Sequence, residues 1–340
     1  MKVRLKMISD ATGFSPATVS NALNNKKGVN KQTASTILKA ARELGYISEE
    51  RISKIRFVIY RRNGKIIDDT PFFNLLIDGA QRECRQLGYE MVISRLERND
   101  PEYEQQARWM LRDTHAAVIL LGTELIEDDI EVYRDSHCPF LLFDYFDASM
   151  DFSGVAIDNE DSARKATRYL IAKGHRSIGY LRGEFRIQAF RKRAAGYRAA
   201  LKEAGLSPHP SGIFTLATNM DGAYNDMVRI LEAKPELPTA FFADNDMIAL
   251  GAMKALQENG YRIPQDVSLV GFDDLPFSEI VSPRLTTIRV SKPEMGATAV
   301  RKMHEIINRT GTAKTKIEVC TDFVERDSVQ TPESNHKKER

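Results

Sequence analysis

The sequence is poor in cysteine and tryptophan and contains no long apolar run. Its 340 residues include three cysteines and one tryptophan. Cys84, Cys138 and Cys320 are far apart and lack the spacing of metal ligands, which favours reduced thiols over a disulfide framework or a zinc site. No segment is apolar for long enough to be a signal peptide or a membrane span. We therefore expect a cytoplasmic protein with no membrane partner.

Motifs of common cofactor-dependent and metal-dependent enzymes are also missing. No Gly-x-Gly-x-x-Gly follows an apolar run, and no Gly-Lys-Ser/Thr phosphate loop is present. The six histidines do not occur in the His-Glu-x-x-His spacing of a zinc site. Acidic pairs such as Asp68-Asp69 and Asp128-Asp129 are typical of solvated loops. The sequence thus predicts a binding protein rather than an enzyme, with no cofactor and no resident metal.

The charge is small in total but unevenly distributed. The formal net charge of the chain is +2, yet residues 1–56 carry eleven Lys and Arg against four Asp and Glu. The remaining 284 residues carry 38 basic and 43 acidic side chains. A small basic segment on a mildly acidic body suits a polyanionic partner that only the N-terminal segment contacts.

The N-terminal segment has the pattern of a helix-turn-helix. An amphipathic stretch from Leu5 to Ala11 precedes Gly13, which can adopt the left-handed backbone of a tight turn. Ser15 and Pro16 are typical of the N-cap and the first turn of a second helix. This helix directs Val19 inward and leaves a short polar face outward. Such a face can enter a DNA major groove and meet base edges.

The other two helices of this segment are expected to support the second. In the first helix, Leu5, Ile8 and Ala11 are expected to face the core. A third helix, over residues 31–44, follows a good N-cap at Asn30. Its apolar side chains are Ile37, Leu38, Ala41 and Leu44. The three helices predict a small all-α headpiece.

Beyond residue 56 the sequence alternates short apolar runs with amphipathic segments. One series of runs lies at 57–60, 90–93, 117–121 and 140–143, and a second at 154–157, 177–181, 239–242 and 268–272. Apolar strands separated by helices are typical of parallel sheets covered on both faces. Gly88, Gly174, Gly205 and Gly260 each precede an extended run, where a helix would end. These features predict an α/β core of two doubly wound parallel-sheet subdomains.

Polar residues gather where the predicted strands end. Asp144 follows one strand, and similar positions are occupied by Asp158 and Asn159, by Asp244 to Asp246, and by Asp273 and Asp274. Ligands of open α/β sheets bind at the carboxyl ends of strands, which in a two-subdomain core means the cleft between them. Arg193, Phe72 and Phe73 add a cation and two aromatic faces. Each Asp or Asn taken alone is more typical of a helix cap; the repetition favours a binding site.

Several segments together resemble the LacI/GalR family of bacterial transcription regulators, the lactose and galactose repressor type. The likeness runs from residue 3 to about 326 and depends on residues 11–20, 173–176, 193–197, 243–251, 270–274 and 283–288. It implies a helix-turn-helix headpiece, a periplasmic-binding-protein-like core, a homodimer and a near-palindromic operator in double-stranded DNA. It also implies a small-molecule effector.

The resemblance assigns expected roles to individual residues. Pro16, Ala17 and Asn21 match the positions that read bases, although the family more often has Arg at the position of Asn21. Positions that hold phosphates are matched by Ser15, Ser20, Asn24, Asn30, Thr33 and Tyr46. Effector-contacting positions are matched by Phe73, Asp144, Asp158, Arg193, Asn245 and Asp273, and Phe72 lies beside them.

The sequence departs from the family pattern at three places. Arg4 replaces a usual threonine. The linker from Tyr46 to Phe57 is several residues short and lacks the leucine that enters the minor groove, so Ile52 is the candidate for that role. An Asn-Gly hairpin signal follows the first core strand, and Arg61, Arg62 and Lys65 beside it suit a solvated turn or, less readily, a phosphorylated effector.

These observations predict a DNA-binding transcriptional regulator, most simply a repressor, controlled by a sugar, with a purine as the second candidate. The alternatives are a sugar-binding protein without gene control and a regulator controlled by a protein partner. The expected domains are a headpiece at 1–47, a hinge at 48–56, a core at 57–330 and a tail at 331–340. Within the core we expect one subdomain at about 57–156 plus 289–316 and the other at about 157–288 plus 317–330.

Overall fold

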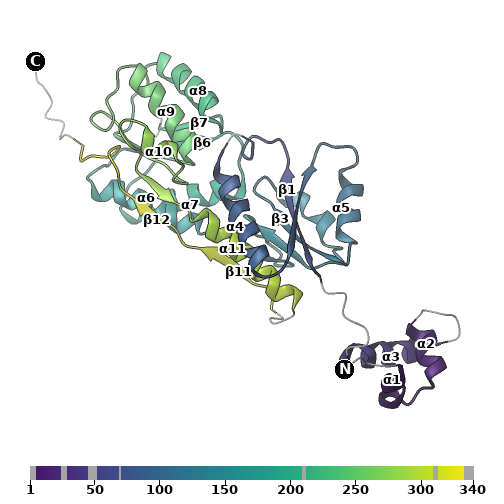
Figure 1. The fold of residues 1–340 in the computed structure, drawn as a ribbon. Coiled ribbons are helices and arrows are strands. Elements are labelled where there is room, and N and C mark those ends of the chain that lie inside the picture. The colour runs from purple at the N-terminus through teal and green to yellow at the C-terminus, as the bar shows by residue number, and fades with distance from the viewer. Residues whose placement is uncertain are drawn as a thin grey trace, which may run out of the picture. The chain divides into compact units, whose positions relative to one another are not determined.

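The computed structural model describes residues 5–23, 29–44, 52–68, 70–208, 212–308 and 313–332. The chain forms two compact units, Met1–Ser53 and Lys54–Arg340, which are described here one at a time as the headpiece and the core (Figure 1).

The headpiece contains three helices around a small apolar centre. They are α1 (Leu5–Thr12), α2 (Pro16–Leu23) and α3 (Lys31–Glu43). The fully buried side chains are Ile8, Val19, Ala22, Ile37 and Ala41. The expectation for Ala11 is wrong: it is exposed. A residue six positions after Leu5 lies about 120° away around a helix with 3.6 residues per turn, outside a narrow apolar face.

The first lobe of the core, called lobe one below, is built on a six-stranded parallel sheet. Its strand order is β11-β5-β4-β3-β1-β2. The strands are β1 (Lys54–Arg61), β2 (Glu90–Glu97), β3 (Ala116–Leu121), β4 (Phe140–Phe143), β5 (Ser153–Ile157) and β11 (Lys316–Val319). The helices are α4 (Phe72–Gln86), α5 (Tyr103–Leu111) and α11 (Lys292–Ile307), with short 3₁₀ turns η1 (Glu127–Asp129) and η2 (Glu131–Tyr133).

Lobe two contains a four-stranded parallel sheet of order β7-β6-β8-β9. Its strands are β6 (Ile178–Gly183), β7 (Ile213–Leu216), β8 (Ala240–Ala243) and β9 (Ser268–Val270). Its helices are α6 (Asn159–Ala172), α7 (Gln188–Glu203), α8 (Met220–Glu232), α9 (Asp246–Glu258) and the short α10 (Phe277–Ile280). A separate antiparallel pair joins β10 (Thr287–Arg289) to β12 (Asp322–Val324).

The α/β class and the two parallel sheets are confirmed, while the assignment of strands to sheets differs in part. The run at 154–157 opened the second predicted series, but β5 pairs with β4 in the first sheet. Likewise, β11 pairs with β5, so residues 317–319 lie in lobe one. The edge strand β7 was not predicted, because its alternating exposed and buried residues form no apolar run.

The four glycines expected at helix ends all have the predicted backbone. Gly88, Gly174, Gly205 and Gly260 have φ between +66° and +101° and follow the C-cap residues of α4, α6, α7 and α9. A left-handed residue at this position ends a helix and turns the chain into the next strand.

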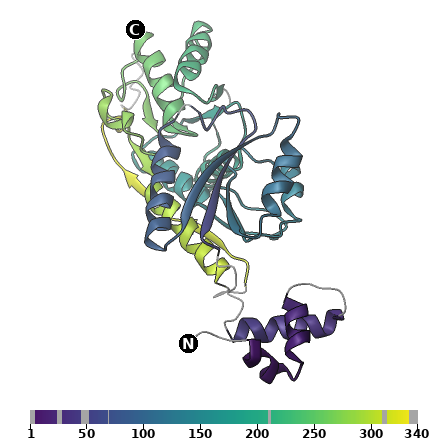
Figure 2. The same cartoon turned by 45° about the vertical axis from the view of Figure 1, so that its right-hand side comes forward.

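Two close backbone contacts join helices α4 and α11 of lobe one. Helices α4 and α11, more than 200 residues apart in the sequence, lie side by side in both views (Figures 1 and 2). A Cβ at Gly79 would meet the Pro293 carbonyl oxygen, and one at Gly296 would meet that of Leu76. Only glycine permits this approach. The N-terminus of α11 is thereby held beside the segment that carries Phe72.

The Asn-Gly hairpin prediction is wrong. Strand β1 pairs only in parallel, with β2 and β3, among the residues that the structure describes. The fully buried Glu124 carboxylate instead accepts four N–H bonds of 2.8–3.0 Å, from Arg62, Asn63, Gly64 and Ile66. This carboxylate satisfies the loop's donors, which in a hairpin would bond to a partner strand.

Candidate functional site

Helix α2 presents the face expected to read DNA. Ser15 caps it, because its Oγ accepts the Thr18 N–H at 3.2 Å. Pro16 and Ala17 in the first turn are exposed, and Asn21 is half-buried one turn later. Their opposite neighbours Val19 and Ala22 pack in the core. The base-reading assignment therefore lies on an accessible face but stays a prediction.

The residues expected to hold phosphates gather at the starts of α2 and α3. Asn30 caps α3 through a 2.8 Å bond from the Thr33 N–H to its Oδ1. Ser20 is half-buried in α2. Free N–H groups at a helix N-terminus favour a phosphate, so these positions suit the expected contacts. Arg4, Asn24, Tyr46 and residues 48–51 of the predicted hinge at 48–56 lie outside the described residues. Ile52 is described and half-buried, and the last three residues of the predicted hinge, 54–56, already belong to β1.

A cavity lies between the two lobes of the core. It contains six of the seven residues expected to meet an effector: Phe72, Phe73, Asp144, Arg193, Asn245 and Asp273. The first three come from lobe one and the others from lobe two. The cavity is also lined by Lys65, Ile66, Thr70, Thr123, Ile157, Ile187, Ala189, Phe190, Thr218 and Met247. A ligand here would contact both lobes at once.

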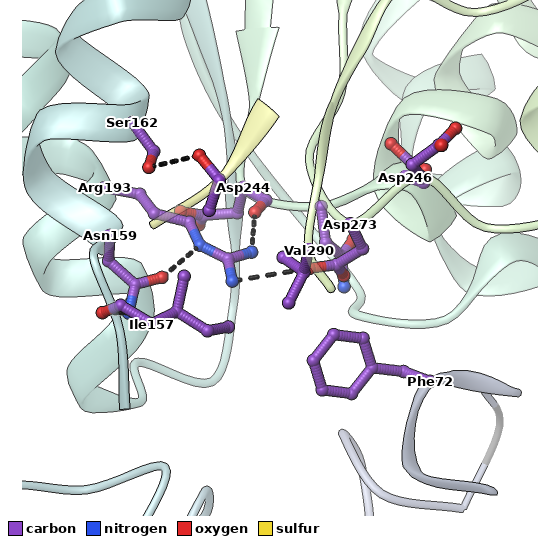
Figure 3. Close-up of polar contacts among 12 residues, drawn as sticks. Phe72, Ile157, Asn159, Ser162, Arg193, Asp244, Asp246, Asp273 and Val290 are labelled. Atoms are coloured by element: carbon purple, nitrogen blue, oxygen red, sulfur yellow. Dashed lines mark hydrogen bonds and ion pairs between the residues drawn. The ribbon is translucent and has the colours of Figure 1, made fainter. Parts of the chain in front are cut away.

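Arg193 on α7 is the central cation of this cavity (Figure 3). It is only 3% exposed, and its guanidinium lies 3.6 Å from the centroid of the Phe272 ring. Its Nε donates to Asn159 Oδ1 at 2.8 Å and its Nη1 to the Asp244 carbonyl oxygen at 2.6 Å. Its Nη2 is 3.4 Å from Asp273 Oδ1. These contacts leave the guanidinium oriented toward the cavity rather than toward solvent.

Two buried carboxylates of the cavity keep acceptor capacity. Thr123 donates to Asp144 Oδ2 at 2.7 Å, whereas Asp144 Oδ1 and Asp273 Oδ1 accept no hydrogen bond from the described residues. Burial raises the pKa of Asp144 to about 6 and also raises the pKa of Asp273, against the opposing effect of Arg193. Asp273 Oδ1 still has the 3.4 Å ion pair with Arg193, whereas Asp144 Oδ1 has no such contact. Buried oxygens with incomplete hydrogen bonding are costly, so a ligand that donates to them gains affinity.

Asp144, Asp273 and the neighbouring Asp274 also have unusual backbone conformations. Asp144 has φ +58°, Asp273 has φ +118° and Asp274 has φ +52°. Left-handed backbone at a residue other than glycine costs of order 1–3 kcal/mol each and concentrates at functional positions. At Asp144 and Asp273 it turns a strand-end carboxylate toward the cleft.

The other strand-end residues divide between binding and structural roles. Asn245 lines the cavity and also caps α9, accepting the Ile248 N–H at 3.0 Å. Asp158 does not line the cavity; it caps α6 through the Asp161 N–H at 3.2 Å. Its effector role remains a prediction that its placement does not favour. Asp246 is buried away from the cleft and accepts bonds from Leu275 N, Ser278 Oγ and Thr287 Oγ1, while burial raises its pKa to about 7.

The three basic residues at the end of β1 and in the loop after it all form ion pairs. Arg61 pairs with Glu97 at 2.6 Å, Arg62 with the buried Asp129 at 2.7 Å, and Lys65 with Glu184 of lobe two at 2.6 Å. These pairs argue against a phosphorylated effector at this loop, and against a simple solvated turn at Arg62.

Sequence reasoning missed several lining residues for different reasons. Thr123 follows β3 and would have been found by the strand-end rule applied to that strand. Thr218, Ile187 and Phe190 belong to loops or helices whose sequence shows no signal for the cleft. Lys292 does not line the cavity but contacts the backbone of Asp273, and no sequence signal pointed to it.

Comparison with known proteins agrees with this two-part architecture. Residues 4–49 match the family described as "Bacterial regulatory proteins, lacI family". Residues 167–329 match the family described as "Periplasmic binding protein-like domain". The HTH-type transcriptional repressor PurR of Haemophilus influenzae (strain PittEE) is 30% identical over 337 residues, covering 96% of this chain and 98% of PurR.

Solved structures give the same result for the fold. The complex of the transcriptional regulator CelR with cellobiose is 27% identical, with a TM-score of 0.73 and coverage of 96% of this chain and 99% of CelR. A lac repressor dimer bound to operator and the anti-inducer ONPF shares the fold at 23% identity, with a TM-score of 0.70, covering 97% of this chain and 100% of that chain.

The combination of a lacI-type headpiece and a periplasmic-binding-protein-like core defines a ligand-responsive class of DNA-binding proteins. This chain belongs to the lacI family of bacterial regulatory proteins, and its matched relatives are DNA-binding transcriptional repressors. The match over the headpiece disfavours the alternative of a sugar-binding protein without gene control. No helix within the described ranges is long and apolar enough to cross a membrane.

Proposed function

We propose that this repressor's affinity for a near-palindromic operator is controlled by a neutral, polyhydroxylated small molecule, a sugar, bound between the two lobes. The observation that carries the proposal is a pair of carboxylate oxygens in one cavity with Arg193: Asp144 Oδ1 accepts no hydrogen bond from the described residues, and Asp273 Oδ1 has only its 3.4 Å ion pair with Arg193. Vicinal hydroxyls donate to carboxylates and accept from a guanidinium in the same plane. An anionic ligand would instead meet two carboxylates and two cations, Arg193 and Lys65, that are already paired with Asp273 and Glu184.

The aromatic side of the cavity supports a purine as the second candidate. The rings of Phe72 and Phe73 are 5.1 Å apart and edge-to-face. An aromatic face covers the apolar side of a sugar ring and also stacks on a nucleobase. The relatives named PurR keep this second candidate in view, whereas the CelR structure contains cellobiose. The remaining acceptor capacity of Asp144 and Asp273 favours the ligand with more hydroxyl donors.

Control of operator affinity follows from thermodynamic linkage. A ligand that contacts Phe72 of lobe one and Arg193 of lobe two stabilises one relative orientation of the lobes. In a homodimer that orientation sets the spacing of two headpieces, and only one spacing fits both half-sites. Coupling of this kind amounts to about 1–3 kcal/mol, or roughly 5–150-fold in affinity.

Apolar side chains on both lobes support the homodimer. Leu75 and Ile93 of lobe one and Phe277 and Ile280 of lobe two are exposed, Ile280 by 78%. Exposed apolar side chains that form a contiguous patch are typical of surfaces that a partner covers. Sedimentation analysis of the wild type is expected to give a dimer, and Ile280→Asp is expected to weaken it. A monomeric wild type at micromolar concentration would contradict this part of the proposal.

The decisive experiment combines ligand screening with operator selection. Thermal-shift measurements with cellobiose, D-ribose, other mono- and disaccharides, adenine and guanine are expected to show stabilisation by a neutral sugar. Selection from random duplexes, with and without that compound, is expected to enrich one near-palindromic motif to different extents. Stabilisation by a nucleobase alone would overturn the sugar assignment. Failure to enrich any motif would overturn operator control.

A further inference from the structure

Lys292 is a buried lysine at the junction of the two lobes. It is the first residue of α11 and only 4% exposed. Burial disfavours its charge and lowers the pKa of its ammonium, against the effects of Asp273, Asp246 and Asp274. A cation in the first turn of a helix also opposes the helix dipole. A lysine that is disfavoured in two ways must be held by specific compensating contacts.

Those contacts are backbone carbonyl oxygens at the edge of the effector cavity. Lys292 Nζ donates to the carbonyl oxygen of Asp273, to that of Asp274 at 3.1 Å and to that of Val290 at 3.4 Å. Asp273 and Asp274 are two of the left-handed residues described above. The ammonium therefore fixes the turn that directs the Asp273 carboxylate toward Arg193.

The second carboxylate of this turn is held on its other side. Asp274 pairs with Arg289 at 2.6 Å and with Arg326 at 2.7 Å. Its side chain thus points away from the cavity while its carbonyl oxygen faces Lys292. The turn between β9 and α10 is fixed at both ends, with Lys292 as the contact from lobe one.

Lys292 also lies next to an effector candidate of lobe one. Its Nζ is 5.6 Å from the centroid of the Phe72 ring, a distance at which a cation and an aromatic face attract. Phe72 begins α4, which packs against α11, and Figure 3 shows Phe72 close to Asp273 and Val290. One ammonium therefore supports a lining residue of each lobe from outside the cavity.

We propose that Lys292 is a positioning residue of the effector site, which holds the Asp273–Asp274 turn and the Phe72 ring in the relative placement that the effector requires. This inference rests on the proposed function for its effector readout. Lys292 does not touch the effector; it acts through Asp273 and Phe72. Because it joins α11 of lobe one to a turn of lobe two, its loss weakens the coupling between effector and operator as well as effector affinity.

The charged groups around Lys292 determine a second readout that needs no ligand. Asp273, Asp246 and Asp274 face it from lobe two. The other cations near these carboxylates are Arg193, Arg289 and Arg326. Arg193 and Lys292 both lower the pKa of Asp273. Because loss of Lys292 leaves only Arg193, the pKa of Asp273 rises further. The destabilisation caused by Lys292→Met is therefore expected to shrink as pH falls from 8 to 5, because the buried carboxyl then takes up a proton.

The test uses the full chain with Lys292→Met, Lys292→Gln and a matched control. Lys302→Met removes another buried lysine of α11, which pairs with Glu305 at 2.9 Å and does not line the cavity. Melting temperatures are measured from pH 5 to 8. Binding of cellobiose, D-ribose, adenine and guanine is measured by calorimetry. Lys292→Gln keeps donors for the carbonyls and serves as the folded comparison if Lys292→Met does not fold.

For any probe that the wild type binds, we expect Lys292→Met to lower affinity by roughly tenfold or more, which corresponds to one lost charge-assisted contact. Lys292→Gln is expected to lose less, and Lys302→Met is expected to match the wild type in both affinity and pH profile. If Lys292→Met binds the probe as tightly as the wild type, and its difference in melting temperature does not vary with pH, the positioning role is overturned. If the wild type binds no probe, the proposed effector class fails, and the pH profile alone still decides whether Lys292 supports Asp273.

Discussion

The headpiece and the effector cavity use side chains in opposite ways. The residues expected to contact DNA lie on the exposed side of α2 and at the starts of two helices, while the small core behind them is purely apolar. The residues expected to contact the effector are buried charges, such as Arg193 and Asp273, held by other buried polar groups. Recognition is therefore separable from folding in the headpiece and inseparable from it in the core.

This difference determines how each site responds to mutation. An exposed side chain that binds DNA can be removed with little effect on stability, because nothing in the protein depends on it. Removal of a buried charge leaves its partner without compensation. The predictions below test this contrast, from the largest expected effect to the smallest.

Replacement of Arg193 is expected to have the largest effect. Arg193→Met leaves the Asp273 carboxylate without its nearest cation and the Asp244 carbonyl without a donor. Loss of one partner of a buried ion pair costs about 3–5 kcal/mol. We expect a large decrease in the free energy of unfolding and loss of the effector response, with operator binding by the folded fraction retained.

Lys192→Met is the matched control for Arg193. It lies on the same helix, but its ammonium pairs with Glu318 at 3.0 Å near the surface. Chemical denaturation and operator titration of both variants make the comparison. Equal destabilisation of the two would show that burial of Arg193 does not have the importance assigned to it.

Asp144 is expected to show a pH-dependent effect on both stability and effector binding. Its pKa in the folded protein is about 6, above the ordinary value of an aspartate, so the folded state holds the proton more tightly than the unfolded chain. Stability from this group is therefore present at low pH and lost as pH rises through the window from about 4 to 6, by about 3 kcal/mol.

Asp144→Asn removes that titration while keeping an acceptor for Thr123. Its stability relative to the wild type is expected to increase from pH 4 to 6 and to stay constant above pH 7. The effector affinity of the wild type is expected to fall below pH 6, as the carboxylate becomes protonated. A constant stability difference across this range, measured by denaturation at each pH, would contradict the assigned pKa.

The same contrast explains what sequence analysis could predict. The headpiece follows from local signals: the Ser15 and Asn30 caps, the Gly13 turn and the apolar spacing of Val19, Ile37 and Ala41 all act within a few residues. The error at Ala11 was one of helical phase. Local chemistry of this kind is readable because it does not depend on distant parts of the chain.

The cavity was predicted only as far as strand ends could be recognised. Asp144, Asn245 and Asp273 follow apolar runs, so topology brings them to the carboxyl edges of the two sheets, which face the cavity. Which of them faces the ligand could not be predicted, because Asp158 follows the same rule and caps a helix instead. The role of Lys292 could not be predicted from any sequence pattern, because it depends on a turn 18 residues earlier in the sequence.

Asn21 is expected to show the separability of recognition from folding. Asn21→Ala removes a half-buried side chain of α2 that no core residue requires. We expect operator preference to relax at one base pair, with a loss of about 1–3 kcal/mol of discrimination there, and an unchanged melting temperature. Ser35→Ala on the exposed side of α3 is the control. Selection from random duplexes that returns the wild-type motif for Asn21→Ala would place base reading elsewhere.

Ser15 is expected to give the smallest effect and the finest test of the comparison. Ser15→Ala removes the cap of α2, which costs about 1 kcal/mol of headpiece stability. Because the cap orients the first turn that carries Pro16 and Ala17, affinity is expected to fall by similar factors for all duplexes, without a change in preferred sequence. Ser15→Asp restores an acceptor for the Thr18 N–H but adds a negative charge. Restored stability in Ser15→Asp, together with weaker DNA binding, would separate the capping role of Ser15 from its expected contact with phosphate.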